Sequence, residues 1–369
     1  LKIIGQSVWL DFISRDLIQS GQLKKLVEND CVCGVTVNPT IFEQAMVDSY
    51  LYDEDIRTML SQGVSIADIY HKLMVADVVE ASKILWPLYE KSDGLDGYVS
   101  IEVAPKYAHD AKKTIKEAHE LWSQANHQPN IMIKVPGTEE GQEAIRHLTA
   151  EGFNINVTLL FSPGQYKKSA DAYLAGIKQR ADANAAIDKI NSVASVFISR
   201  IDTLVDKKLE ELMLTKAADE KVLENLKGKI GVAIVKQTYH EYRELLKSKR
   251  WKDLAACNAN PQRVLWASTS TKNPAYSDVK YVEELIAAMS INTMPLKTLS
   301  AFRDYENVRE TIEDNYGEAK ENLALLEKAG INLNEVFSTL EEEGIQKFEA
   351  SYEHLFAMLE EKCDKMMAA

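Results

Sequence analysis

Eight short apolar runs alternate with longer amphipathic stretches along most of this chain, and this alternation is the strongest constraint on its fold. Most of the runs are nearly continuous in Val, Ile and Leu, which is typical of parallel strands covered on both faces. The predicted strands are residues 7–12, 32–38, 98–103, 131–136, 155–161, 192–199, 263–269 and 291–295. Eight strand–helix units predict an α/β protein with a (β/α)8 TIM barrel.

The stretches between the predicted strands have helical periodicity. We expect helices within residues 14–29, 109–125, 139–150, 164–180 and 278–288, two or three within 41–97, and two within 200–262. Ser14, with Asp16 in the following turn, is a candidate N-cap for the first of them.

The pattern becomes wholly helical after residue 296 and ends in a Glu/Lys-rich stretch over 333–366. We therefore expect one catalytic domain over residues 1–369, with the barrel at about 5–300 and a helical C-terminal extension at about 301–369. From the sequence, this extension could cover the barrel mouth, cover a flank or mediate assembly.

The main alternative fold is a doubly wound open sheet. Such a sheet usually carries a glycine-rich phosphate-binding turn after its first strand. Here the first predicted strand continues into the sequence LDFISRDL, and neither a G-x-G-x-x-G nor a Walker motif occurs in the chain. The barrel with additional helices is therefore the favoured prediction.

Charge and cysteine content limit the partners of the protein. The formal net charge is −13, and Lys and Arg alternate with acids on the predicted helix faces, so a nucleic acid or a membrane surface is disfavoured as a partner. Cys31 and Cys33 lack the spacing and the neighbouring ligands of a metal site, and we interpret them as packing residues of a reducing cytoplasm. We expect a cytoplasmic protein with no metal or other cofactor, and an anionic substrate would need a locally basic pocket.

Polar and functional side chains lie at the ends of the predicted strands. In a barrel, the C-terminal ends of the strands converge on one pocket, so we expect these side chains to meet there. The candidates, in chain order, are Asp11, Asn38, Glu102, Lys134, Asn156, Thr158, Ser195, Phe197, Arg200, Ser268 and Lys272. They cover all but the last of the eight strand ends.

Several of these residues also have a purely structural interpretation. Asp11 could cap the following helix, and Asn38, which precedes a proline, could serve only the turn. Glu102 and Lys134 could form a buried ion pair that holds the barrel together. Thr158 suits a strand because it is β-branched, Phe197 could be a core residue, and Arg200 could pair with Asp202 at a helix start.

The set also fits one specific chemistry. A lysine amine in apolar surroundings is more often neutral, and a neutral amine attacks a ketone to form a Schiff base, an electron sink for carbon–carbon cleavage. Asp11 would move protons, and Glu102 with Thr158 would orient a water molecule. Asn38, Asn156 and Ser195 suit a polyhydroxylated substrate. Arg200 and Lys272 suit its phosphate.

These residues lie in motifs that resemble the transaldolase family. The motifs run in order through residues 5–300 as WLDFISRDL, GVTVNPTIFEQA, GYVSIEV, IKVPGT, NVTLLFS, SVASVFISRID, LWASTSTKNP and NTMP. The seventh-strand motif and the helical tail are similar to those of a longer bacterial subgroup. The resemblance implies a metal-free transferase of the pentose phosphate pathway. It would carry a dihydroxyacetone unit from sedoheptulose 7-phosphate or fructose 6-phosphate to erythrose 4-phosphate or glyceraldehyde 3-phosphate.

The resemblance also implies residue roles. It makes Lys134 the Schiff-base lysine and Asp11 the general acid/base, and it gives the remaining candidates the water, sugar and phosphate contacts named above, with Phe197 shaping the acceptor side. The chain departs from the family at Val37, at Gly137 and after the seventh strand, where either Ser268 or Lys272 aligns with a phosphate contact. A simple fructose 6-phosphate aldolase and a non-catalytic sugar-phosphate-binding protein are the alternative functions. Assembly into a homo-oligomer stays open.

Overall fold

Eight parallel strands close into a barrel in chain order, β1 to β8, so the predicted fold class is confirmed. The computed structural model describes residues 1–46, 49–216, 218–305 and 308–368. All eight predicted strands are present, each within a few residues of its predicted bounds. They are β1 Gln6–Leu10, β2 Val32–Val35, β3 Tyr98–Glu102, β4 Ile131–Pro136, β5 Ile155–Leu160, β6 Ser192–Phe197, β7 Gln262–Ala267 and β8 Ser290–Met294.

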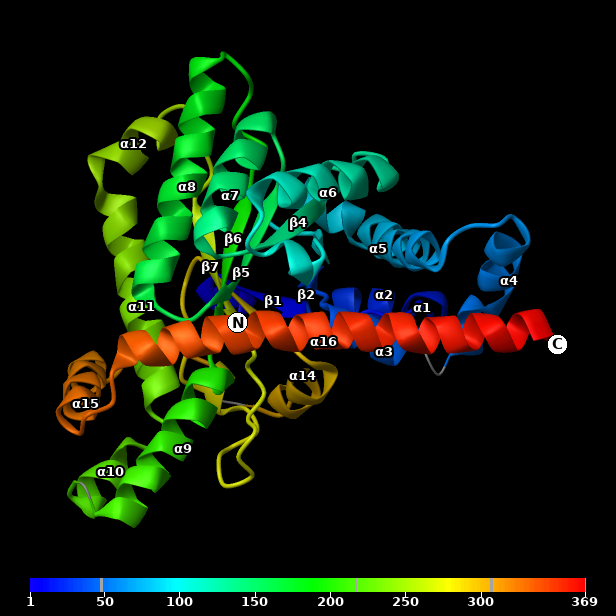
Figure 1. Cartoon of the computed structure of the whole chain (residues 1–369). Coiled ribbons are helices and arrows are strands. Elements are labelled where there is room, and N and C mark those ends of the chain that lie inside the picture. The colour runs from blue at the N-terminus through cyan, green and yellow to red at the C-terminus, as the bar shows by residue number, and fades with distance from the viewer. Residues whose placement is uncertain (47–48, 217, 306–307, 369) are drawn as a thin grey trace.

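Helices surround the barrel on its outside (Figure 1). Predicted segments 109–125, 139–150 and 164–180 form α6 Ala111–Gln124, α7 Glu139–Glu151 and α8 Pro163–Asp182. The predicted helix 14–29 is divided into α1 Arg15–Gln19 and α2 Gln22–Asn29, because Gly21 adopts a left-handed φ of 72°. Ser14 caps α1 as predicted, since its hydroxyl accepts the Leu17 N–H at 3.1 Å.

The two long connections contain more helix than a single crossover needs. The described part of residues 41–97 holds three α-helices, within the two or three predicted, and the described part of residues 200–262 holds four where two were predicted. The first set is α3 Pro39–Met46, α4 Asp53–Ser61 and α5 Ile66–Lys91. The second is α9 Ser199–Thr215, α10 Glu220–Leu226, α11 Ile230–Lys247 and α12 Lys249–Ala255.

The predicted helix over 278–288 is wrong except for the four residues of α13, Lys280–Glu283. Buried polar side chains take the backbone groups that a longer helix would use. The Leu285 carbonyl accepts hydrogen bonds from Gln6 Nε2 at 2.9 Å and from Trp266 Nε1 at 3.1 Å, and the Ile286 N–H donates to Thr311 Oγ1 at 3.0 Å. Tertiary contacts therefore override the local pattern.

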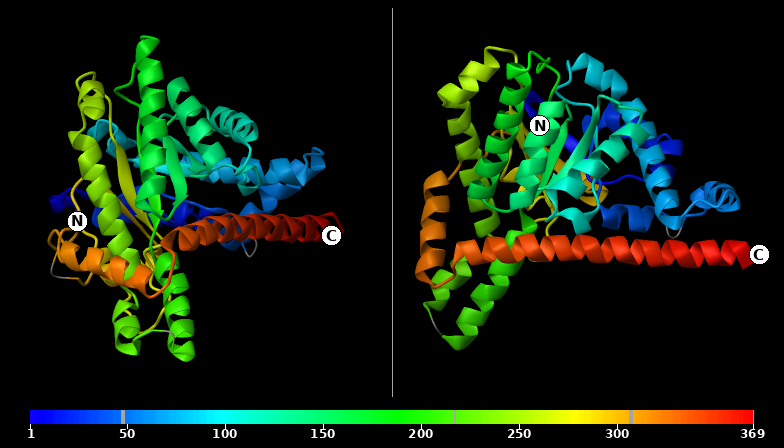
Figure 2. Two further views of the ribbon diagram at one scale, coloured as in Figure 1. Left: turned by 60° about the vertical axis from the view of Figure 1, so that its left-hand side comes forward. Right: turned by 45° about the horizontal axis from the view of Figure 1, so that its top comes forward.

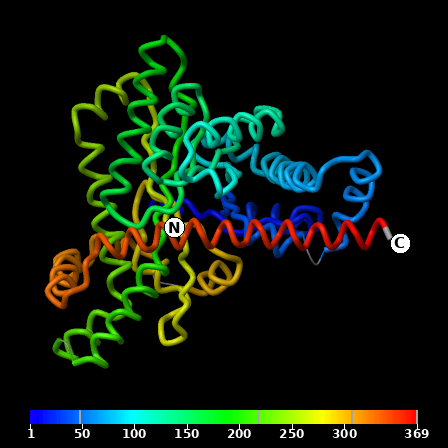
Figure 3. The backbone as a smooth tube through the Cα atoms, in the orientation of Figure 1, coloured from blue at the N-terminus to red at the C-terminus, as the bar shows by residue number. Residues whose placement is uncertain are grey.

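The C-terminal extension consists of α14 Leu296–Phe302, α15 Tyr316–Lys328 and α16 Leu333–Ala368. The prediction of continuous helix after residue 296 is wrong for the described residues between α14 and α15. The predicted pattern over 333–366 forms α16, a single straight rod that starts beside α15 and ends beyond α4 (Figures 2 and 3).

Side-chain bonds hold α16 along its length. Gln165, at the start of α8, donates to Glu341 near one end of the helix, and Lys362 pairs with Asp53 of α4 at 2.8 Å near the other. Between them, the hydroxyls of Ser351 and Thr40 lie 2.8 Å apart. Helix α16 passes over the end of β5 and over α9, so it covers the barrel mouth. This is the first of the three possibilities that the sequence left open.

Candidate active site

A cavity of about 130 Å³ lies at the C-terminal ends of the barrel strands. Nine of the eleven candidates line it or its rim, together with residues that the sequence did not single out. The cavity is lined by Asp11, Thr36, Asn38, Lys134, Thr158, Ser195, Phe197, Arg200, Ala267, Ser268, Ser270, Lys272, Thr293, Pro295 and Phe348. The two remaining candidates, Glu102 and Asn156, lie beside Lys134 in the sheet register.

Lys134 lies at the centre of this arrangement and is only 4% exposed. Its amine donates to Glu102 Oε2 at 3.1 Å and to the Val37 carbonyl at 3.0 Å. The buried ion pair of the structural interpretation therefore exists, but its lysine also faces a polar cavity. Burial raises the pKa of Glu102, and the neighbouring lysine charge opposes that rise.

Asp11 follows β1 and faces the same cavity. It does not cap α1, because Ser14 has that role, so the capping interpretation of Asp11 is wrong. Its carboxylate accepts a 2.7 Å hydrogen bond from the Thr36 hydroxyl, which also lies 2.7 Å from the Thr293 hydroxyl. Burial raises the pKa of Asp11, while Lys134 and Thr36 hold it down. A carboxyl group with these opposing influences is suited to exchange a proton.

The fifth and sixth strands supply a linked polar layer beneath the mouth. Ser195 Oγ donates to Asn156 Oδ1 at 2.7 Å, and Asn156 Nδ2 donates to Ser100 Oγ at 2.9 Å. The Thr158 hydroxyl is buried and has no hydrogen-bond partner within the part of the chain that the structure describes. An unpaired buried hydroxyl costs about 1–3 kcal/mol, so its presence at the cavity favours a role in holding water or substrate.

The structure decides whether Asn38 has only a turn role and whether Arg200 pairs with Asp202. The Asn38 side chain lines the cavity and also accepts the Ile41 N–H at 3.1 Å, so its turn role is present as well. Arg200 does not pair with Asp202, whose carboxylate binds the Gly231 N–H at 2.6 Å and the Tyr281 hydroxyl at 2.7 Å. The expected Arg200–Asp202 pair is therefore wrong.

The Arg200 guanidinium lies between two aromatic rings. Its central carbon is 5.1 Å from the centroid of the Phe197 ring and 5.4 Å from that of Phe348. Phe197 is 7% exposed and lines the cavity, so it is both a buried packing residue and a candidate site residue. Burial lowers the pKa of Arg200, although nearby acids, Glu102 first, oppose this.

After β7 the structure brings both ambiguous residues to the cavity. Ser268 has a left-handed φ of 56°, and its hydroxyl lies 2.7 Å from that of Ser199. The Lys272 amine donates to Ser270 Oγ at 2.8 Å. Burial lowers the pKa of Lys272, and the charges of Lys347 and Arg200 lower it further. Ser268 and Lys272, either of which aligns with a phosphate contact of the family, therefore lie in one loop and line one cavity.

The two other departures from the family leave the polar groups in place. Val37 contributes its backbone carbonyl, which does not depend on the side chain. At Gly137, a Cβ atom would lie 2.3 Å from Leu160 Cδ2, so the side chain of Leu160 occupies the place of the methyl group.

Sequence reasoning missed six of the residues that line the cavity, and four of these have polar or aromatic side chains. The statement that the eighth strand end lacks a polar residue is wrong, because Thr293 of β8 lines the cavity. Thr36 lies two residues before Asn38 in the predicted strand 32–38, and a strand places such residues on one face, so this spacing was an available signal. Ser270 stood within the seventh-strand motif. Phe348 of α16 had no local signal, because only the tertiary fold brings it above Lys134, 5.7 Å from the amine to the ring centroid.

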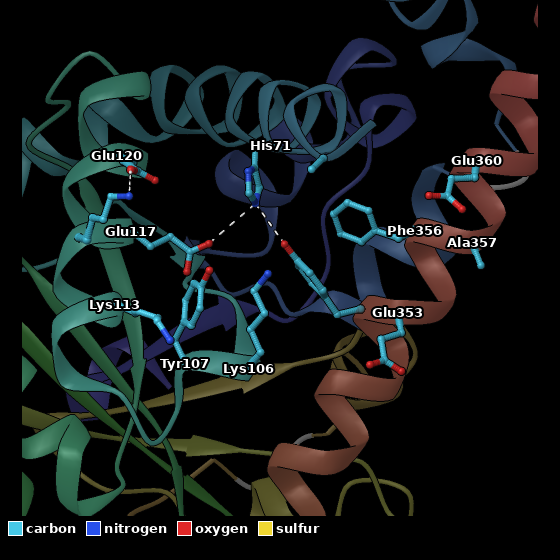
Figure 4. Close-up of a pocket in the computed structure, with 13 residues that line it drawn as sticks. His71, Lys106, Tyr107, Lys113, Glu117, Glu120, Glu353, Phe356, Ala357 and Glu360 are labelled. Atoms are coloured by element: carbon cyan, nitrogen blue, oxygen red, sulfur yellow. Dashed lines mark hydrogen bonds and ion pairs between the residues drawn. The ribbon is translucent and has the colours of Figure 1, made fainter. Parts of the chain in front are cut away.

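A larger cavity of about 650 Å³ lies beside the mouth, between α5, α6 and α16 (Figure 4). Its described lining contains none of the eleven candidates. Glu117 and Tyr352 approach His71 from two sides: His71 Nε2 is 3.2 Å from the Tyr352 hydroxyl and 3.8 Å from Glu117 Oε1. This cavity therefore lies in the surface against which α16 packs.

The described residues contain no group of three or more His, Cys, Asp or Glu side chains that could hold a metal ion. None of the described helices is long and apolar enough to cross a membrane. Cys33 is buried, as a packing residue should be, but Cys31 is exposed before β2, so the packing interpretation of Cys31 is wrong.

The fold and the cavity together define a (β/α)8-barrel enzyme with a buried lysine and two carboxyl groups at its strand ends. Comparison with known proteins narrows this class. The sequence model of the transaldolase/fructose-6-phosphate aldolase family matches residues 8–359. The chain belongs to this family.

Curated relatives match over nearly the full length. A protein named transaldolase from Trichodesmium erythraeum is 45% identical over 368 residues, which cover 98% of this chain and 96% of the relative. A transaldolase 2 from Nostoc punctiforme is 44% identical over 98% of this chain and 96% of its own length. A transaldolase from Frankia alni is 42% identical, with coverage of 97% and 95%.

Proposed function

We propose that this chain is a transaldolase that works through a Schiff base on Lys134. The single observation that carries the proposal is the placement of the Lys134 amine, 4% exposed, 3.1 Å from Glu102 and facing a cavity that Asp11 also lines. The near-complete match to relatives named transaldolase supports the transferase activity itself.

The first steps load the donor onto the lysine. Glu102, whose pKa is raised by burial, takes a proton from the Lys134 ammonium, and the neutral amine attacks the ketone carbon of the donor sugar. The resulting carbinolamine loses its hydroxyl as water and becomes the Schiff base. Glu102 and the unpaired Thr158 hydroxyl are the groups suited to hold that water.

Asp11 then removes the proton from the sugar hydroxyl on the far side of the carbon–carbon bond that will break. The carbon–carbon bond breaks, the aldehyde product leaves, and the electron pair stays on the lysine-bound dihydroxyacetone unit. Attack of this unit on the acceptor aldehyde reforms a carbon–carbon bond, and Asp11 returns its proton to the new hydroxyl. Water finally releases the ketose from Lys134.

The remaining side chains suit a sugar phosphate. The linked amide and hydroxyl of Asn156 and Ser195 supply acceptors and donors for the dihydroxyacetone unit, and Asn38, which follows β2, lines the same cavity. Arg200 and Lys272 offer cations for the phosphate. We propose sedoheptulose 7-phosphate or fructose 6-phosphate as donor, and erythrose 4-phosphate or glyceraldehyde 3-phosphate as acceptor.

Two broader expectations belong to the same proposal. Residues 1–369 act as a single catalytic unit, because the C-terminal helix supplies Phe348 to the cavity that the strands form. A cytoplasmic location remains our proposal, based on thiols that are free in the structure.

Borohydride trapping tests the proposal. Reduction in the presence of fructose 6-phosphate should fix an adduct on Lys134, identified by peptide mapping, and no adduct should form without the sugar. A Lys134→Met variant is the matched control. An adduct on another lysine, or none on the wild type, would contradict the proposal.

The competing activity is simple aldol cleavage, in which the bound dihydroxyacetone unit is released to water. Turnover measured with and without an aldehyde acceptor separates the two activities. A transaldolase should require the acceptor, whereas an aldolase should release dihydroxyacetone at the same rate in its absence.

A further inference from the structure

Buried cations elsewhere in this protein have oxygen partners. At the opposite end of the barrel, Arg263 pairs with Asp96 at 3.0 Å, and both side chains are largely buried. Near α5, Arg15 contacts Asp77 at 3.1 Å and Asp55 at 2.6 Å. Buried Lys236 instead donates to the backbone carbonyls of Thr311 and Asp314. These partners offset the high free energy of a buried charge.

The cations at the barrel mouth are less buried, since Arg200 is half-buried and Lys272 is exposed, and their contacts differ. Arg200 contacts the faces of Phe197 and Phe348, and Lys272 contacts the hydroxyl of Ser270. Over residues 1–46, 49–216, 218–305 and 308–368, no carboxylate approaches either cation within ion-pair distance. Two like charges held at one cavity without a partner fit an anionic ligand better than a structural role.

Helix α16 brings a third cation to the same place. A Cβ atom at Gly344 would lie 3.2 Å from Arg200 Nη1 and 3.0 Å from Leu159, so α16 passes very close to the guanidinium. Lys347 follows three residues later, on the same side of the helix, and it directly precedes Phe348, which covers Lys134. Lys347 is exposed, and its charge acts on Lys272 across the mouth.

We propose that Lys347 is the third cation of the phosphate site, so that the C-terminal helix binds the phosphate end of the sugar. This inference rests on the proposed function, because it assigns the helix to the phosphorylated substrates of that reaction. Arg200 provides a planar fork for two phosphate oxygens, and the two lysines provide point charges from a loop and from a helix.

The arrangement explains why three like charges face one another. In the absence of an anion they repel, and the charges of Glu102, Glu343 and Asp11 act on Arg200 in the opposite sense. A phosphate with two negative charges would replace this repulsion by attraction. Its binding would also draw the middle of α16 toward the strand ends and keep Phe348 over the lysine.

Binding of inorganic phosphate, measured by isothermal titration calorimetry, tests the inference without any turnover. Lys347→Gln should weaken phosphate binding roughly five- to tenfold, the size expected for one charge-assisted contact near solvent. Lys365→Gln is the matched control, because Lys365 is an exposed lysine of the same helix that pairs with Glu361. It should leave phosphate affinity unchanged.

Kinetics and hydrogen exchange complete the test. Lys347→Gln should raise KM for fructose 6-phosphate by the same factor and leave kcat/KM for unphosphorylated fructose unchanged. Phosphate should slow amide exchange over residues 340–352 in the wild type but not in Lys347→Gln. Equal phosphate affinity in Lys347→Gln and Lys365→Gln would overturn the inference.

The two proposals fail in different ways. If borohydride labels Lys134 but Lys347→Gln binds phosphate normally, only the role of Lys347 is wrong. If the wild type forms no lysine adduct but Lys347→Gln binds phosphate more weakly than the wild type, the Schiff-base function is wrong and the anion site stands.

Discussion

Glu117 of α6 is a buried carboxyl group that should make the stability of the protein depend on pH near neutrality. Its Oε2 accepts the Ala104 N–H at 2.7 Å, two residues beyond Glu102, and its side chain is 9% exposed. Burial raises its pKa from the ordinary 4.5 to about 7, although the Ala104 N–H and Lys106 oppose the rise.

The size and sign of the effect follow from this difference in pKa. Between pH 4.5 and 7 the folded protein keeps a proton on Glu117 that the unfolded chain has lost, so the free energy of unfolding falls as pH rises through this range. One pKa unit corresponds to about 1.4 kcal/mol, and the full shift therefore corresponds to about 3 kcal/mol.

Glu117→Gln replaces the acid by a neutral group of the same shape that can still accept the Ala104 N–H. At pH 5 we expect it to be more stable than the wild type by only about 1 kcal/mol, because the unfolded wild type has lost part of its proton at this pH. At pH 8 we expect it to be more stable by up to about 3 kcal/mol, because the wild type must then hold a buried charge.

Urea unfolding at pH 5, 6, 7 and 8 measures this difference. Other groups titrate in the same range, including Asp202, whose pKa burial raises to about 6, and His71, whose pKa burial lowers. The comparison between variant and wild type removes their contributions to first order. Glu80→Gln, at an exposed glutamate of α5 that pairs with Lys83, is the control and should not reproduce the stabilisation at pH 8. A Glu117→Gln difference that is constant across pH would refute the reasoning.

The remaining predictions concern the cavity. Asp11→Ala should mainly depress kcat, because an acid/base group acts in the chemical step, and Lys272→Ala should mainly raise KM for phosphorylated donors; unchanged donor affinity in Lys272→Ala would contradict its phosphate role. Phe348→Ala should destabilise the protein by about 3 kcal/mol, as loss of a buried aromatic ring does. Because it also opens Lys134 to water, it should raise acceptor-independent release of dihydroxyacetone, and an unchanged ratio of release to transfer would argue against a water-excluding role for the ring.

The barrel and most of its site could be predicted because their signals are local. A parallel strand covered on both faces needs apolar side chains at nearly every position, so Lys134 and Glu102 stood out against their surroundings. The chain order of the strands is their order around the barrel, so strand ends that are distant in sequence converge without further information. Thr36 does not stand out in the sequence, because the predicted strand continues to Asn38, two residues further on.

Tertiary competition limited the helix predictions. Residues 278–288 have an apolar pattern that suits a helix, but the barrel requires the Leu285 carbonyl to accept from Gln6 and Trp266. These donors come from β1 and β7, so no window of sequence around residue 285 contains them. The division of helix 14–29 had a local signal in Gly21, which permits the left-handed backbone there.

The position of α16 lay beyond local sequence for a different reason. Its apolar stripe shows that the helix packs against something, but a stripe of this kind does not identify its partner. In the structure, Tyr352 contacts His71 of α5 on one side of the mouth, and Glu341 contacts Gln165 of α8 on the other. Gly344 and Phe348 lie between these two attachments. Gly344 has no side chain where Arg200 comes closest, and Phe348 fills the space above Lys134. A helix anchored on both sides of a pocket, with its smallest residue beside a cation and an aromatic residue over the buried lysine, is part of the pocket wall.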